Sequence, residues 1–470
     1  MKLYVDLCLF KYHHSTNAGR CQPVHMNLQP FRTELRILFH LGLPIALAEL
    51  SSMLLATLGT FMIGQVNVTD VAAAGATNPI FWLVALIGIG GLSMTSPLVA
   101  AADERDDPAE VKRILYASGI TSFLFSLVEG IVLIVIALNF QLLGHEQDVA
   151  RLAQPYLWIL IAQLPMMSLY FNLIYFIDGL SMTKVGLVFS LAGALLGGTL
   201  NWIFVFGIGG IPQLGVAGLG LSFFLTIVAQ LIGLIVYLRR GARFKTIMNA
   251  VIHKDEIWAK TREFIGLALP VSGQALIEYS AYSLGAVWVG HLGKYSLAGH
   301  QVAMTLASTT FVVLMAIGTA GSIRIGQAFG QKNHSQIRLS GFSAMFLAVT
   351  LVLIPALCFM FGSGSIARAF IEDSKVWDIA SALIVIAGLF QVSDAMQSVG
   401  ISLLRGMEDT RMPSIISFVA YWLLGMPIAY WLTFQLGWGV KGVWVGFLIA
   451  LSTQAVWFTW RFYWLSGRHV

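Results

Sequence analysis

Two carboxylates stand in the middle of apolar stretches of this sequence. Glu278 lies within residues 267–290, and Asp394 lies within the later stretch 376–403. About 20 mostly apolar residues form a helix long enough to cross a bilayer. A carboxylate at that depth costs at least a few kcal/mol unless it faces a partner, water or a cavity. Acids in such places typically mark ion or substrate pathways, so we expect both residues to bind cations.

The chemistry expected of Glu278 and Asp394 is the exchange of one cation for another. In a partly desolvated cavity the charged carboxylate is disfavoured, so it holds a proton or another cation. If the two acids are close, they titrate as a pair. Oxygen ligands suit hard cations, so the same two residues are candidates for a Na⁺ site as well as for H⁺.

Other polar side chains are candidates to line the same cavity. Gln391 lies one helical turn before Asp394, on nearly the same face. Glu49 has two readings, a functional acid or a residue that snorkels or forms a structural hydrogen bond. The full set of candidates is Gln391, Gln301, Tyr279, Ser283 and Glu49.

The composition places these residues in a membrane protein. Hydrophobic residues make up 57% of the 470-residue chain and charged residues 11%, against about 25% in a soluble chain. The mean hydropathy is +0.79. The three cysteines are scattered, without the spacing of a disulfide framework or a metal site. The net charge of +5 is explained by basic membrane loops, so no nucleic acid partner is expected.

Apolar periodicity predicts an all-α integral membrane protein with twelve transmembrane helices and no separate soluble domain. The expected spans are 35–63, 72–101, 114–140, 152–176, 183–207, 215–238, 263–289, 297–322, 340–362, 376–403, 413–435 and 440–465. With the N-terminus inside, 23 of the 28 lysines and arginines fall on the side of the termini and 5 on the other. Because basic residues stay in the cytoplasm, we expect both termini to be cytoplasmic.

An internal repeat divides the chain. Shifting the sequence by 226 residues brings residues 43–64 onto 269–290, with prolines, glycines and apolar positions in agreement. Two repeats of six spans run the same way through the membrane, so their pseudo-two-fold axis lies along the membrane normal. The expected units are an N-terminal lobe (31–238), a cytoplasmic linker (239–262) and a C-terminal lobe (263–470). Residues 1–30 are either a cytoplasmic extension or a start-site artefact, with Met26 as the true beginning.

Three motifs of the second half carry a family resemblance. They are LAGHQVAM at 297–304, RIGQAFG at 324–330 and LRGMEDTRMP at 404–413. Over roughly 30–465 the chain resembles the multidrug and toxic compound extrusion (MATE) transporters, in particular the bacterial cation-coupled drug exporters. Glu278 and Asp394 match the acids of the C-terminal lobe in those proteins.

The resemblance implies a secondary active antiporter, not an enzyme, that works by alternating access. It would export amphipathic organic cations such as drugs and dyes in exchange for H⁺ or Na⁺, without a cofactor. It also implies a multi-pass monomer in the bacterial inner membrane, surrounded by lipid. The first span departs from the family, because Gly59 stands where many members carry an aspartate. Glu49, 10 residues upstream, is the candidate to replace it.

Three rival functions remain to be weighed. A lipid-linked oligosaccharide flippase of the same superfamily should carry basic residues in its cavity, yet only Lys184 and Arg405 stand near span ends. The spans contain no nucleophile motif typical of a membrane-embedded enzyme. A channel would not need two lobes. The flippase is the nearest alternative to the antiporter.

Overall fold

The computed structural model describes residues 29–144, 146–210, 212–370 and 373–468. Within these ranges every regular element is a helix. Most of the expected segment 1–30 lies outside the described residues, and so does the choice between Met1 and Met26 as the first residue.

The first half of the chain forms seven α-helices and one short 3₁₀ turn within the described residues. They are α1 (Gln29–Gly64), α2 (Val68–Leu92), α3 (Thr95–Glu104), α4 (Pro108–Leu138), η1 (Phe140–Leu143), α5 (Gln147–Gly179), α6 (Thr183–Phe206) and α7 (Gly215–Arg240). The predicted span 72–101 is broken, because α2 ends at Leu92 and α3 starts at Thr95. At the break the Ser93 hydroxyl donates to the carbonyl oxygen of Gly90 (2.6 Å), which occupies a backbone group at the helix end.

The second half follows a short linker helix, α8 (Ala242–Asn249). Its long helices are α9 (Lys254–His291), α10 (Lys294–Gly330), α11 (His334–Phe370), α12 (Ser374–Gly406) and α15 (Val440–Arg468). Between α12 and α15 the chain is helical with two π-helical turns: α13 (Arg411–Phe418), η2 (Val419–Gly425), α14 (Met426–Tyr430) and η3 (Trp431–Gln435).

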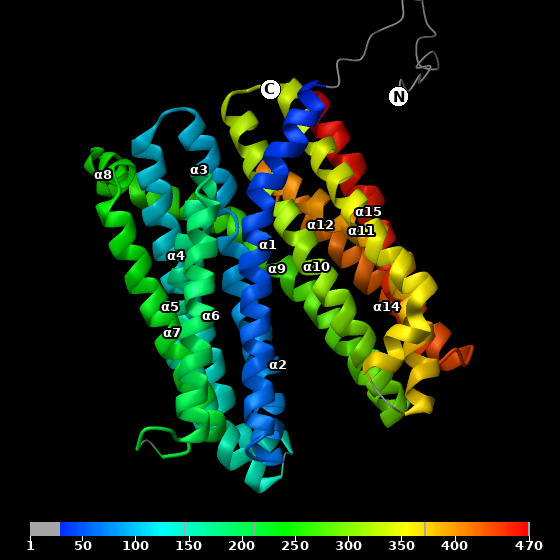
Figure 1. Ribbon diagram of the computed structural model, residues 1–470. Coiled ribbons are helices and arrows are strands. Elements are labelled where there is room, and N and C mark those ends of the chain that lie inside the picture. The colour runs from blue at the N-terminus through cyan, green and yellow to red at the C-terminus, as the bar shows by residue number, and fades with distance from the viewer. Residues whose placement is uncertain (1–28, 145, 211, 371–372, 469–470) are drawn as a thin grey trace, which may run out of the picture.

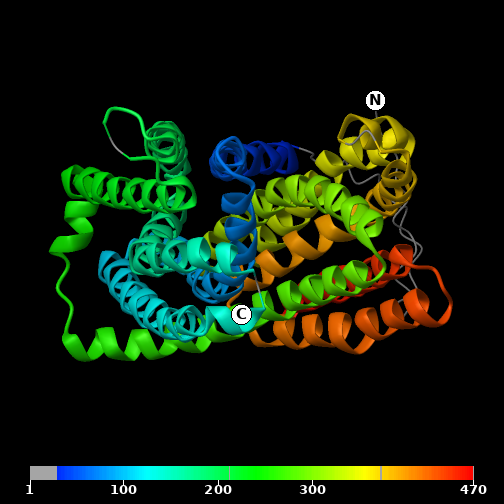
Figure 2. The ribbon, with the colours of Figure 1, turned by 90° about the horizontal axis from the view of Figure 1, so that it is seen from below.

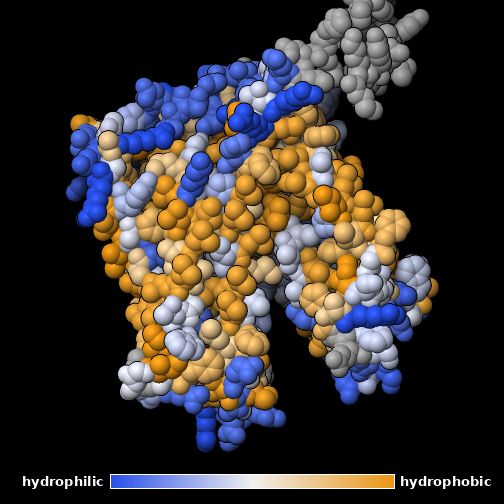
Figure 3. Space-filling view, in the orientation of Figure 1, coloured by the Kyte–Doolittle hydropathy of each residue, from blue (hydrophilic) through white to orange (hydrophobic). Residues whose placement is uncertain are grey.

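Eleven helical segments of the described residues are long and apolar enough to cross a membrane. α9 is a twelfth helix of membrane length, since its 38 residues span about 57 Å. Its middle carries Ser272, Gln274 and Glu278, which make it more polar than the other spans. Figure 3 shows the broad apolar surface that such helices present to lipid. The protein is therefore an all-helical, multi-pass membrane protein.

The helices form two groups that meet at one end of the molecule and separate at the other (Figures 1 and 2). α1 to α7 lie in one group and α9 to α15 in the other, and α1 stands at the edge of the first group, where it contacts α10 and α11 as well as α6. The space-filling view shows a cleft between the groups that opens at the end opposite the chain termini (Figure 3).

Close packing of backbone against backbone holds the two groups together at the end of the termini. Gly326 and Gly330 on α10 lie against the backbone of Pro97 and Ala101 on α3, where a Cβ atom on Gly330 would stand 2.5 Å from the Ala101 oxygen. We call this contact between α3 and α10 the seam. Beside it, the Ser272 hydroxyl on α9 donates to the carbonyl oxygen of Ile87 on α2. Only glycine, which has no Cβ atom, permits α3 and α10 to approach so closely at the seam.

An ion pair fastens the start of α1 to the second group beside the seam. The Glu34 side chain is 3% exposed, and its oxygens accept from Arg324 Nε (2.8 Å) and NH2 (3.0 Å). Gln336 Nε2 (2.8 Å) and Ser340 Oγ (2.6 Å) on α11 also donate to Glu34. The carboxylate is therefore satisfied only while α1, α10 and α11 stay together.

We expect Glu34→Gln to loosen this end of the molecule. Breaking a fully buried ion pair costs about 3–5 kcal/mol. Arg324 keeps some solvent contact, with a side chain 19% exposed, so we expect about 2 kcal/mol. Spin labels at Arg105 and Ser335, both exposed and in opposite groups, should report a larger separated population. The matched control is Glu263→Gln. Glu263 forms an ion pair with Lys260, but its side chain is 53% exposed, so this change should have little effect. Equal effects of the two changes would contradict the role of Glu34.

Gly59 and Gly285 occupy corresponding places in the two groups. A Cβ atom on Gly59 would contact Leu219 and Phe223, and one on Gly285 would contact Val443 and Phe447. Leu219 and Phe223 precede Val443 and Phe447 by 224 residues, close to the shift of the sequence repeat. The first group therefore has a small, closely packed residue, and no acid, at the position of Gly59.

Candidate functional site

Glu278 lies at the centre of a hydrogen-bond network in the second group of helices. Its Oε1 atom accepts from Gln274 Nε2 (2.8 Å) on its own helix and from Gln397 Nε2 (3.1 Å) on α12. Ser417 Oγ on α13 is a third donor at 3.3 Å. Three helices therefore hold one carboxylate oxygen in place.

Gln454 on α15 completes the network. Its Oε1 atom accepts from Gln397 Nε2 (3.1 Å) and from Ser417 Oγ (3.4 Å). The Gln454 side chain is fully buried, and its Nε2 atom has no hydrogen-bond partner among the described residues. The network can therefore donate one more hydrogen bond, from Gln454 Nε2, to another polar group.

Asp394 joins Glu278 through its neighbours on α12. It is 6% exposed and lies within hydrogen-bonding reach of Ser398, which donates to Gln397 Oε1 (3.0 Å). Asp394 also interacts electrostatically with Glu278. The structure thus brings the two predicted acids into one cluster, where a negative charge on one disfavours a negative charge on the other.

Two tyrosines lie beside the acid pair. The hydroxyl groups of Tyr282 on α9 and Tyr421 on η2 are 3.0 Å apart, and their rings meet edge to face. Both tyrosines interact electrostatically with Glu278 and Asp394. Tyr421 is only 1% exposed, so the partly exposed ring of Tyr282 is the aromatic surface next to the carboxylates that suits an organic cation.

Tyr279 and Ser283, which are predicted to line the cavity, lie outside the hydrogen-bond network of Glu278. Tyr279 is half-buried and Ser283 is exposed, and neither donates to a side chain of the cluster in the described structure. Helical periodicity explains the difference. Residues 274, 278 and 282 are four apart and share one face of α9. Residues 279 and 283 each follow a member of this set by one position, so their side chains lie about 100° further around the helix axis.

Arg405 places a positive charge behind the network, where the sequence indicated a cavity almost free of bases. Its NH2 atom donates to Gln274 Oε1 (2.7 Å), and its NH1 atom lies 3.5 Å from Ser93 Oγ in the first group. Gln274 therefore stands between Arg405 and Glu278 and bonds to both. The cluster contains two acids and one nearby base.

Gln391 and Gln301 lie apart from the carboxylate of Glu278. Gln391 Nε2 donates to Thr310 Oγ1 on α10 (2.9 Å), while its Oε1 atom is buried without a partner among the described residues. Gln301 is exposed on α10. Its neighbour His300 is buried and accepts a hydrogen bond from Trp444 Nε1 (3.0 Å), as expected of a structural histidine.

Glu49 belongs to a different cluster, in the first group of helices. Its side chain is exposed on α1 and interacts electrostatically with Asp178, Tyr170 and Tyr175 of α5. Asp178 is 3% exposed. Its interaction with Glu49 could not be read from the sequence, because the two residues are 129 positions apart.

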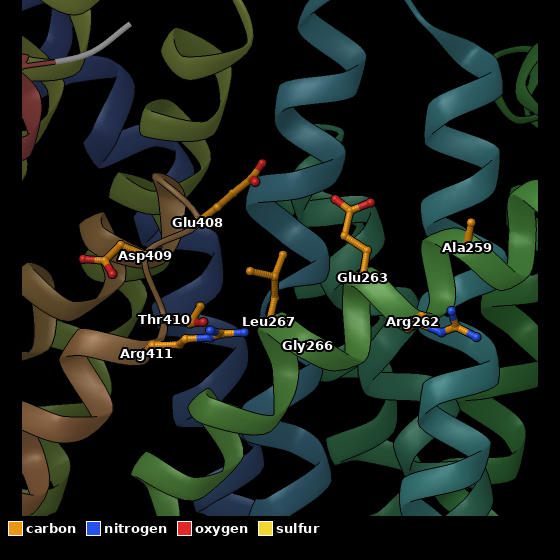
Figure 4. Close-up of a pocket in the computed structure, with 9 residues that line it drawn as sticks. All are labelled: Ala259, Arg262, Glu263, Gly266, Leu267, Glu408, Asp409, Thr410 and Arg411. Atoms are coloured by element: carbon orange, nitrogen blue, oxygen red, sulfur yellow. The ribbon is translucent and has the colours of Figure 1, made fainter.

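A pocket of about 640 Å³ lies at the end of the termini, away from Glu278 (Figure 4). It is bounded by the first turns of α9 and by the link between α12 and α13. Its lining includes three acidic residues and two arginines: Glu263, Glu408, Asp409, Arg262 and Arg411. Burial raises the pKa of Glu408 in that link, while Lys260 and Arg105 act in the opposite direction. All the residues that line this pocket belong to the second group of helices.

The comparisons with known proteins agree with this architecture. The family model described as MatE matches residues 44–203 and 270–431. The chain belongs to the MatE family. The two matched segments begin 226 residues apart, which is the shift of the internal repeat. As a MATE protein it is a multidrug efflux transporter and not an enzyme.

Relatives of this MATE transporter cover almost its whole length. It is 28% identical over 441 residues to the "Probable multidrug resistance protein NorM" of Rhizobium meliloti, covering 93% of this chain and 94% of the relative. It is 29% identical to the "Multidrug resistance protein MdtK" of Edwardsiella ictaluri, covering 93% and 97%. Among solved structures it resembles an "Outward-facing conformation of a multidrug resistance MATE family transporter", with a TM-score of 0.82, 19% identity and coverage of 94% and 98%.

Proposed function

We propose that this MATE transporter is a secondary active antiporter that exports amphipathic organic cations in exchange for H⁺ or Na⁺. The observation that carries the proposal is the position of Glu278, held by three donors and electrostatically coupled to Asp394. Two carboxylates beside the aromatic rings of Tyr282 and Tyr421 form a cluster that can hold one cation at a time.

The exchange rests on competition for Glu278. When H⁺ or Na⁺ occupies the acid pair, the cluster is close to neutral and attracts an organic cation only weakly. Release of that ion leaves a negative charge that Gln274, Gln397 and Ser417 stabilise by hydrogen bonds. The negative cluster then binds the organic cation, and return of the ion displaces it.

Access to the cluster alternates in this proposal. Ser272, which contacts the first group, is six residues before Glu278, or about 9 Å along α9. Glu278 thus lies close to the level where the cleft ends. We take 31–238 and 263–470 as the two moving lobes and 239–262 as the linker. The closed seam and the open far end correspond to an outward-open state if the termini are cytoplasmic.

The orientation belongs to the same proposal. The excess of lysine and arginine at the end of the termini favours cytoplasmic termini. The curated relatives are bacterial proteins. We therefore place this transporter in the bacterial inner membrane, as a monomer, with the cleft open to the outside.

Sodium would have to be held by oxygens of the acid cluster. No group of three or more His, Cys, Asp or Glu side chains fit to hold a metal occurs in the described part of the chain. Glu278 and Asp394 supply carboxylate oxygens, and Gln391 Oε1, which has no partner among the described residues, is an amide oxygen on the same helix as Asp394. Carboxylate and amide oxygens suit a hard cation.

Efflux from proteoliposomes tests the proposal. Vesicles loaded with tetraphenylphosphonium should release it faster than protein-free vesicles when a H⁺ gradient or a Na⁺ gradient is imposed. One of the two gradients should drive most of the flux, because a single acid pair couples it. An anionic dye of similar size should move much more slowly, since the cluster carries two acids. Equal transport of the anionic dye would favour the flippase, for which Arg405 near Glu278 is the supporting observation.

A further inference from the structure

A second groove of about 610 Å³ lies on the outer side of the first group, far from Glu278 in the fold. Its walls come from α4, α5, α7 and the linker helix α8. Apolar side chains such as Phe123, Leu173 and Ile235 form most of the lining. Phe123 is 62% exposed, so the groove faces the surroundings of the protein, which at this depth are lipid.

The floor of the groove holds an amide with an unused donor. Asn172 on α5 is fully buried and lines the groove, and its Oδ1 atom accepts from Thr95 Oγ1 (3.0 Å). Its Nδ2 atom has no partner among the described residues. It lies 4.0 Å from the position of a Cβ atom on Gly119, another lining residue. The missing side chain of Gly119 therefore leaves the Asn172 amide facing the groove.

The mouth of the groove carries a positive charge. Arg239, in the last turn of α7, lines the groove and is exposed, and it has no ion pair within the described ranges. It lies three residues before the linker helix α8 begins at Ala242. Asn172 lies seven residues before the end of α5, about 10 Å deeper in the membrane. The groove is thus basic at its mouth, polar at one point below it and apolar elsewhere.

We propose that this groove binds one anionic glycerophospholipid of the surrounding membrane. Its phosphate would contact Arg239, an ester carbonyl would accept from Asn172 Nδ2, and one acyl chain would lie along Phe123 and Ile235. Basic sites between membrane helices typically bind anionic head groups in this way. The volume is within the usual range of ligand sites, about 300–1,000 Å³.

The linker helix α8 covers one side of the groove. Phe244 and Met248 of α8 are lining residues. Lys112 Nζ donates to the carbonyl oxygens of Met248 (2.7 Å) and Ala250 (2.9 Å), and Arg243 binds Asp103 (2.6 Å). These bonds hold α8 against the first group, so a lipid in the groove would stabilise the start of the chain segment that leads to the second lobe.

Native mass spectrometry of the purified full chain tests the proposal. The probes are palmitoyl-oleoyl phosphatidylglycerol and phosphatidylcholine with the same acyl chains. The wild type should retain one phosphatidylglycerol and bind it about fivefold more tightly than phosphatidylcholine, the expected effect of one arginine. Arg239→Gln should remove this preference, and Arg240→Gln, an exposed neighbour outside the lining, should keep it.

Gly119→Leu fills the groove without a clash, because a Cβ atom there has space. It should abolish retention of the phosphatidylglycerol while the protein keeps its thermal unfolding midpoint in lipid-free detergent. Gly130→Leu, on the same helix with no atom within 4 Å of its Cβ, should retain the lipid. Equal retention by the two variants, or competition by tetraphenylphosphonium for the phosphatidylglycerol, would overturn the assignment to a lipid.

Discussion

Replacing Glu278 by glutamine should abolish gradient-driven efflux while the protein still inserts into the membrane. Glutamine keeps the size of the side chain and can still accept from Gln274, Gln397 and Ser417. It cannot take up or release a proton, and it offers no negative charge to a cation. The efflux rate of a cationic dye from cells should therefore fall to that of cells without the transporter. Expression and detergent-purified yield should match the wild type.

Two further variants make this prediction specific. Asp394→Asn should give the same loss, and the double variant should be no worse than either single one, because coupled residues are not additive. Glu49→Gln should be mild, since Glu49 lies in the first group with Asp178 and outside the network of Glu278. Wild-type efflux by Glu278→Gln together with loss in Glu49→Gln would place coupling in the first lobe.

The second large effect is expected at the seam. In Gly330→Leu, the new Cβ atom would stand 2.5 Å from the Ala101 carbonyl oxygen, and a backbone atom cannot move aside cheaply. Overpacking of this kind costs about 1–3 kcal/mol. That free energy shifts an equilibrium between two states by about 5- to 150-fold. The variant should therefore stay open at the end of the termini and lose efflux.

Distances between spin labels at Arg105 and Ser335 would show the shift directly. Gly290→Leu is the matched control, because a Cβ atom on Gly290 has no atom within 4 Å. The control should keep the wild-type distance distribution and most of the efflux. If Gly330→Leu closed the seam and transported at the wild-type rate, close packing of α3 on α10 would not be needed for the cycle.

The helices could be predicted from the sequence, and the two central acids could be singled out as candidates, because both depend on local features. Apolar stretches long enough to span a bilayer are visible without any knowledge of packing. Glu278 and Asp394 stood out because a carboxylate is costly in such a stretch. The break between α2 and α3 was missed, since the side-chain bond of Ser93 to Gly90 forms within a continuous apolar run.

The partners of the acids could not be predicted, because they come from distant segments. Ser417 and Gln454 are 139 and 176 residues beyond Glu278, and no local pattern pairs them. The spacing of four residues along α9 could also have pointed to Gln274 and Tyr282, which share the face of Glu278. Which face of a helix meets the cluster is decided by packing, which one sequence does not reveal.

The role of Arg405 depends on the same kind of long-range packing. In the sequence it is a basic residue near a span end, where it would normally reach the membrane surface. In the structure it reaches Gln274 on α9 and Ser93 in the first group. The position of Arg405 therefore depends on packing at the closed end of the two lobes, and it could not be predicted from the sequence.

The most direct test of Glu278 as the coupling residue is ion release on binding of substrate. Tetraphenylphosphonium would be added to the purified transporter in weak buffer with trace Na⁺, while released H⁺ and Na⁺ are measured. The wild type should release one of the two ions as it binds the organic cation, and Glu278→Gln should release neither. Ion release by Glu278→Gln equal to that of the wild type would contradict the proposed exchange at this carboxylate.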